Sequence, residues 1–163
     1  MKNKNPILTI IGILFLLIGG IGIRNSLIYT NTASIFWFCY IALILIGIGS
    51  LTRNGVLITI QLNILAIPFI IWNADFFYYL FTSKPLFGVT DYWFLAGPIL
   101  PKLISLQHII TIPLSLYILY LLKPNIKNTW KYTILELLII FILTILLTNP
   151  QENINCVFES CVS

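Results

Sequence analysis

The stretch that decides the fold is residues 55–81, GVLITIQLNILAIPFIIWNADFFYYLF, in which Asp75 is the single charged residue. A helix needs about 20 predominantly apolar residues to cross the hydrocarbon core of a bilayer, and this stretch exceeds that length. Pro68 lies inside it, but membrane-spanning helices tolerate proline. The stretch therefore predicts a membrane-spanning helix, and its polar residues Asn73 and Asp75 come towards one end.

The rest of the chain has the same apolar character. Its 163 residues are 59% hydrophobic and 9% charged, with a mean hydropathy of +0.99, whereas soluble domains are roughly half apolar and a quarter charged. Spanning segments must satisfy their own backbone hydrogen bonds, which favours helices over barrel strands for such long runs. We predict a single all-α integral membrane domain over residues 1–163, a polytopic bundle of about five transmembrane helices at 7–23, 34–51, 55–81, 103–122 and 132–148.

The residues outside these helices form an outer segment and an outer tail. Residues 85–102, PLFGVTDYWFLAGPILPK, are too short and too interrupted by proline and glycine to span, so we expect an interfacial or re-entrant segment. Thr90 is expected to cap a short helix there, and Tyr92 and Trp93 suit the headgroup region. Residues 149–163 follow the last helix as the tail.

Basic residues set the expected orientation, because cytoplasmic loops carry an excess of Lys and Arg. The apolar run 7–23 is longer than the core of a typical signal peptide, so we expect it to be retained as the first helix. An odd number of spans then places the N-terminus in the cytoplasm and the C-terminus on the outer side of the cell membrane. This arrangement leaves three basic residues outside, Arg24, Lys84 and Lys102, and six inside, Lys2, Lys4, Arg53, Lys123, Lys127 and Lys131.

With this orientation, the conspicuous polar residues gather near the outer face. His108 comes about five residues inside the outer end of the fourth helix, which is roughly 8 Å at 1.5 Å per residue. Polar groups are costly in hydrocarbon and are usually retained for pairing or for function. The layer predicted at this face consists of Asn73, Asp75, Thr90, Asp91, His108, Glu152, Asn153 and Asn155.

His108 is the single histidine and the strongest candidate for proton transfer, because imidazole ionises near neutral pH. Asp75 and Asp91 complete the candidate catalytic set, since a carboxylate beside an imidazole fixes its tautomer. A structural alternative stands beside this interpretation: a histidine hydrogen-bonded between helices, with the acids in wet loops. No metal-ligand spacing such as HExxH occurs, so we predict no metal site, and no motif identifies a cofactor. The candidate substrate-binding residues are Asn73, Thr90, Glu152, Asn153 and Asn155.

The remaining polar residues and the cysteines favour structural roles. Gln61 and Asn63 are expected to bridge helices. Glu136 is expected near the inner end of the fifth helix, where it snorkels or pairs close to the preceding lysines. Cys39 is expected to pack as a small apolar residue. The tail cysteines, Cys156 and Cys161, form a disulfide or stay free, and glycines in the first two helices predict that these helices pack closely together.

Several short motifs occur together in the last two thirds of the chain. They are Trp72-Asn73-Ala74-Asp75-Phe76, Gly88-Val89-Thr90-Asp91-Tyr92, His108 with Pro113, and residues 149–158, NPQENINCVF. In these motifs the chain resembles, from about residue 55 to 158, a family of small uncharacterised prokaryotic integral membrane proteins. The family has no established activity, so the resemblance implies no catalytic residue, but it implies that the polar motifs act as one unit.

Three classes of function stay open. The first is an integral membrane enzyme that acts on a lipid or lipid-linked substrate, with His108 as general acid or base. The second is a non-catalytic component of a membrane complex, and the third, favoured least, is a transporter subunit, because no inverted repeat is present. The expected surroundings are membrane lipid, with a homo-oligomer or a partner membrane protein left open, and the absence of a basic stripe argues against nucleic acid.

Overall fold

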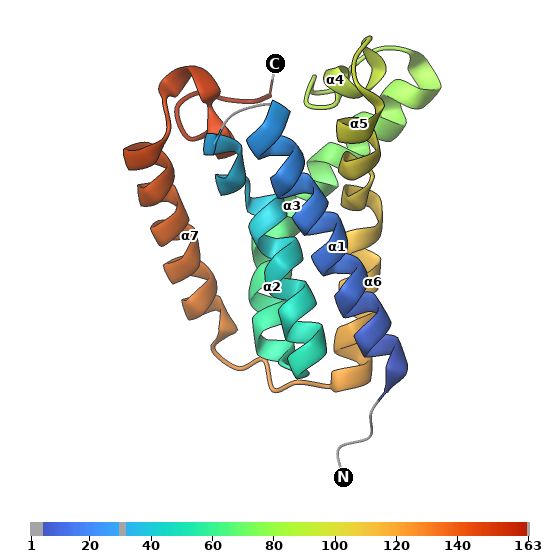
Figure 1. Cartoon of the computed structure of the whole chain (residues 1–163), viewed down its shortest axis with the longest axis vertical. Coiled ribbons are helices and arrows are strands. Elements are labelled where there is room, and N and C mark those ends of the chain that lie inside the picture. Colours follow the sequence, from blue (N-terminus) through green and yellow to red (C-terminus); the bar gives the residue numbers. More distant parts are fainter. Residues whose placement is uncertain (1–4, 30–31, 163) are drawn as a thin grey trace.

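The protein is a bundle of helices, seen in a computed structural model that describes residues 5–29 and 32–162 (Figure 1). Within those residues 79% of the chain is helical and no strand occurs. The elements in chain order are α1 (Pro6–Tyr29), η1 (Thr32–Phe36), α2 (Phe38–Thr52), α3 (Gly55–Thr82), α4 (Asp91–Phe94), α5 (Ile99–Ser105), α6 (Gln107–Leu122), α7 (Thr129–Leu147), η2 (Pro150–Glu152) and η3 (Ile154–Cys156).

Four helical stretches are long and apolar enough to cross a membrane, namely α1, α3, the α5–α6 stretch Ile99–Leu122, and α7. Helix α2 is apolar but has only 15 residues, about 22 Å at 1.5 Å per residue. Helix η1 precedes α2, and Trp37 separates the two. The predicted fold class, an all-α membrane bundle of about five helices, is confirmed.

Helices α1 and α2 approach closely where both carry glycine. A Cβ atom added to Gly47 would lie 2.9 Å from the carbonyl oxygen of Gly12 and 2.8 Å from Leu16 Cγ. Only a residue without a side chain fits so near a facing backbone. The expected packing of the first two helices is therefore confirmed, and it continues into a core that contains Phe15, Leu43, Ile46, Ile58, Leu65 and Phe69.

Two helices begin earlier than the hydropathy pattern indicates. Helix α5 begins at Ile99, inside the segment expected to be interfacial, because proline is tolerated in the first turn of a helix and Pro101 lies there. Helix α7 begins at Thr129 rather than at residue 132, because Lys131 interrupts the apolar run without interrupting the helix. Both shifts place residues deeper than expected, and Glu136 now lies seven residues inside α7.

The outer segment and the tail lie at the same end of the bundle. Figure 1 shows α4 and the start of α5 at this end, together with η2 and η3, whereas α1 begins at the opposite end. We call this end the cap end. Helix α7 stands at one side of the bundle and packs mainly against α3 and η1.

Candidate functional site

The predicted polar residues at the cap end centre on Asp75, which is fully buried near the end of α3. Its Oδ1 accepts hydrogen bonds from the backbone N–H groups of Leu86 at 2.8 Å, Phe87 at 2.7 Å and Gly88 at 3.2 Å. Its Oδ2 accepts from the backbone N–H of Thr90 at 2.7 Å and from the Thr90 hydroxyl at 2.6 Å. We call these five hydrogen bonds the Asp75 anchor.

The Asp75 anchor holds the loop that follows α3 against the end of that helix. Successive backbone N–H groups that converge on one anion form a nest, and an ionised carboxylate is an acceptor only, so all five donors suit it. Gly88 has φ 77°, a left-handed conformation that lets the loop turn at this point. Thr90 does occupy the N-cap position of α4, but its hydroxyl bonds Asp75 and makes no cap hydrogen bond.

His108 lies in the first turn of α6 among aromatic rings. Its ring stacks on Trp72 with centroids 4.7 Å apart and lies 4.4 Å from the ring of Phe69. Its Nδ1 lies 2.5 Å from the carbonyl oxygen of Ser105, an acceptor, so Nδ1 carries the proton. The amide nitrogen of Gln107 lies 3.3 Å from Nε2, which is free to accept from it.

The expected pairing of His108 with a carboxylate does not occur in these hydrogen bonds. The anchoring bonds of Asp75 all go to the 86–90 loop, and those of the His108 ring go to Ser105 and Gln107. Asp91 begins α4, and its Oδ1 is buried without a hydrogen-bond partner among the residues described. The structure thus brings Asp75 and Thr90 together, and in the described parts of the chain no acid hydrogen-bonds the His108 ring.

Asn73 and Trp72 connect α3 to its neighbours. The Asn73 amide donates to the carbonyl of Phe69 at 2.7 Å and to the carbonyl of His108 at 3.0 Å, which joins α3 to α6. The Trp72 indole N–H donates to the hydroxyl of Tyr92 at 3.1 Å, which joins α3 to α4. Burial raises the pKa of Tyr92 above its ordinary value, so its hydroxyl stays protonated at neutral pH.

The tail residues predicted to bind substrate also bond within the protein. Asn155 accepts from the N–H of Phe38 at 2.9 Å and donates to the carbonyl of Phe36 at 2.8 Å, which ties the tail to the η1–α2 junction. Asn153 accepts from the N–H groups of Phe158 and Glu159 at 3.1 and 3.0 Å. Glu152 accepts from the N–H of Asn149 at 2.9 Å, and Cys156 and Cys161 form a disulfide.

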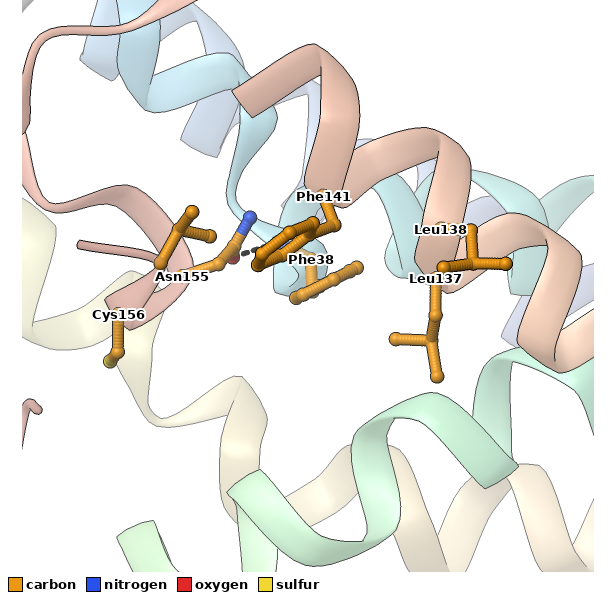
Figure 2. Close-up of a pocket in the computed structure, with 7 residues that line it drawn as sticks. Phe38, Leu137, Leu138, Phe141, Asn155 and Cys156 are labelled. Carbon is orange, nitrogen blue, oxygen red and sulfur yellow. Dashed lines mark hydrogen bonds between the residues drawn. The ribbon is translucent and has the colours of Figure 1, made fainter. Parts of the chain in front are cut away.

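Two pockets in the structure are lined by neither Asp75 nor His108. One, of about 400 Å³, lies between α7, the start of α2 and the tail, and Figure 2 shows the hydrogen bond between two of its lining residues, Asn155 and Phe38. Another, of about 290 Å³, lies between α1 and the α5–α6 stretch and includes Gln107. The first is lined by Phe38, Leu137, Leu138, Phe141, Asn155, Cys156 and Val157. Both are predominantly apolar surfaces, and neither gathers the polar groups that bind a charged substrate.

A second polar group of residues lies deeper, between α3 and α7. The Gln61 amide donates to Glu136 Oε1 at 2.9 Å and to Oε2 at 2.8 Å, and the Asn63 amide donates to the Thr133 hydroxyl at 3.2 Å. The expected bridging role of Gln61 and Asn63 is confirmed. The sequence suggested the nearby lysines as partners of Glu136 and did not indicate Gln61. A signal was present, because a helical spacing places one stripe of residues on the inward face of α7: Thr129, Thr133, Glu136, Ile140 and Thr144.

The His, Cys, Asp and Glu side chains of the described residues form no recognisable metal centre. In the described part of the chain no group of three or more His, Cys, Asp and Glu residues is placed to hold a metal ion. Compared with known proteins, the chain matches no protein family, no curated protein and no solved structure. The family resemblance suggested by the motifs therefore stays a prediction.

Proposed function

We propose that the chain is a non-catalytic integral membrane component whose cap-end polar residues hold its loops in a fixed shape. The observation that carries this proposal is the Asp75 anchor, in which both oxygens of the candidate catalytic acid accept hydrogen bonds from one loop. A catalytic acid needs an oxygen within reach of its substrate or its histidine. The amides of Asn73, Asn153 and Asn155 support the proposal, because each bonds the protein's own backbone.

The partner in this proposal is another membrane protein. Helix α7 supports it, because its outward residues are apolar and exposed, among them Leu138 at 53% and Leu146 at 71%. We also propose that the cap end faces the outer side of the membrane. The disulfide in the tail supports that orientation, because disulfides persist in oxidising compartments.

The test sets this proposal against the enzyme alternative. Purified wild-type protein and the His108→Ala variant are each incubated with lipid extracted from their own membranes, and products are followed by mass spectrometry. We expect no conversion by either protein, and we expect less folded His108→Ala protein per membrane because its ring packs on Trp72. A product formed by the wild type and lost in a folded His108→Ala variant would overturn the proposal in favour of an enzyme.

The second measurement looks for the bound partner protein directly. Native mass spectrometry of the protein released from membranes in mild detergent should show one partner at a fixed ratio. Asp75→Asn should lower the amount of that complex in proportion to the amount of folded protein. A complex that persists unchanged while the loop is released would show that the cap end takes no part in assembly.

A further inference from the structure

Glu136 is a carboxyl group well inside a membrane-spanning helix. It comes seven residues after the start of the 19-residue helix α7, which is about 10 Å along the axis at 1.5 Å per residue. The side chain is half-buried on the face of α7 that packs against α3. An ionisable group at such a depth is costly and is retained where it pairs or functions.

The partner of Glu136 is an amide and not a cation. Gln61 is 1% exposed, and its Nε2 lies 2.9 and 2.8 Å from the two carboxyl oxygens. Next to this pair, Asn63 donates to Thr133, whose own hydroxyl donates to the carbonyl of Thr129 at 3.2 Å. The seam between the two helices is therefore held by uncharged donors.

Among the described residues Glu136 is bonded by Gln61 and makes no ion pair with a charged group of the neighbouring elements. Arg53, which ends α2, is 8 positions before Gln61, about 12 Å along the helix axis, and Tyr132 is the titratable neighbour on α7. Helix η1 has no charged or titratable residue, and the single charged residue of α3, Asp75, is 14 positions beyond Gln61, about 21 Å. The titratable residues Tyr78 and Tyr79 of α3 are further still. On α7 itself, Lys131 lies over the ring of Trp130, 5.7 Å from its centroid. A permanent countercharge for Glu136 is therefore not provided by the elements packed against it.

We propose that Glu136 and Gln61 form a proton-binding site inside the membrane. An amide carries both a donor and an acceptor, so it pairs with either form of a carboxyl group. The ionised form accepts from the amide N–H, as in the structure. The protonated form donates its O–H to the amide oxygen and accepts at its carbonyl oxygen. One proton is gained or lost, and the link between α3 and α7 persists in both states.

Infrared difference spectroscopy of the protein in lipid vesicles tests the site directly. The variant Glu152→Gln with Glu159→Gln leaves Glu136 as the single glutamate, because the chain has three. Carbon-13 labelling of glutamate in this variant should shift a carbonyl band of a protonated carboxylic acid that appears on mild acidification. Glu136→Gln should remove that band, while Glu159→Gln alone should keep it.

A chemical readout covers the case in which Glu136→Gln fails to fold. A protonated carboxyl group adds across a C=N bond of a carbodiimide, and no leaving group is released. A hydrophobic carbodiimide enters the membrane, so it should modify Glu136 in the wild type. A water-soluble carbodiimide should modify Glu152 and Glu159 instead. Either of two results overturns the proposal: no glutamate carboxylic acid band from neutral to mildly acidic pH, or equal modification of Glu136 by both reagents, which would place it in water.

Discussion

At the scale of single residues, Asp75 determines how the cap end is built. Its carboxylate is buried and surrounded by four N–H groups and one hydroxyl that all belong to residues 86–90. Hydrogen bonds to a charged group are each stronger than those between neutral groups. The loop has no helix of its own until α4, so this single side chain supplies much of its order.

Asp75→Asn tests that role with a side chain of the same shape. An amide offers one acceptor oxygen instead of two and turns its own N–H₂ towards two donors, so buried donors are left unpaired. We expect the free energy of unfolding in detergent to fall by about 1–3 kcal/mol, with faster hydrogen exchange at residues 86–90. Thr90→Val, which removes one donor, should lower the free energy of unfolding by less, and Thr90→Ser should lower it least. Equal stability of Asp75→Asn and wild type would show that the anchor contributes nothing.

The sequence could predict which residues share the cap end but not which of them bond. Asp75 and Thr90 were both predicted at this face, and they lie 2.6 Å apart, oxygen to oxygen. The predicted pairing of Asp75 with His108 fails because backbone N–H groups of an irregular loop compete for the carboxylate. Their directions follow no residue pattern, whereas helix faces follow a period of 3.6 residues.

At the scale of helices, α1–α2 and α3–α7 pack by different means. The first pair uses glycine to bring backbones together at Gly12 and Gly47, and the second uses the pairs Gln61–Glu136 and Asn63–Thr133. Glycine periodicity could be recognised in the sequence. The inward stripe of α7 also follows a helical spacing in the sequence. It does not stand out there, because threonine is common in membrane helices and carries no charge.

Gly47→Ala and Gly20→Ala form a matched pair for the first contact. A Cβ atom at Gly47 would lie 2.9 Å from the Gly12 carbonyl oxygen, whereas one at Gly20 would meet nothing within 4 Å. We expect Gly47→Ala to lower stability by about 1–3 kcal/mol, because overpacking forces backbones apart. Gly20→Ala should be neutral or slightly stabilising. Thermal unfolding in one detergent measures both, and equal effects would contradict the close approach.

At the scale of the whole molecule, α1 begins at one end of the bundle and the tail helices η2 and η3 lie at the other (Figure 1). Hydropathy was sufficient to predict the all-α membrane fold. It was less informative at helix ends, where Pro101 and Trp130 lie inside helices that the apolar runs do not cover. Hydropathy alone cannot reveal these ends, because helix formation and apolar character are different properties.

Cysteine labelling on intact cells tests the proposed orientation. Cys156 and Cys161 are joined in a disulfide, while Cys39 is free and packs against the core. A membrane-impermeant maleimide should therefore label the chain only after an impermeant reductant has been added, and only in the tail. Cys39→Ser should give the same labelling. Labelling that requires broken cells would place the cap end in the cytoplasm.

The tail amide has a consequence for the order in which the protein is made. Asn155 bonds the backbone at Phe36 and Phe38, which precede it by more than a hundred residues. A ribosome releases the N-terminal helices first. The beginning of α2 therefore enters the membrane before Asn155, which bonds it, has been synthesised. Residues translated after α7 complete this junction of the first hairpin, and a nascent chain that stops at Leu147 would carry α1 to α7 yet leave the junction open.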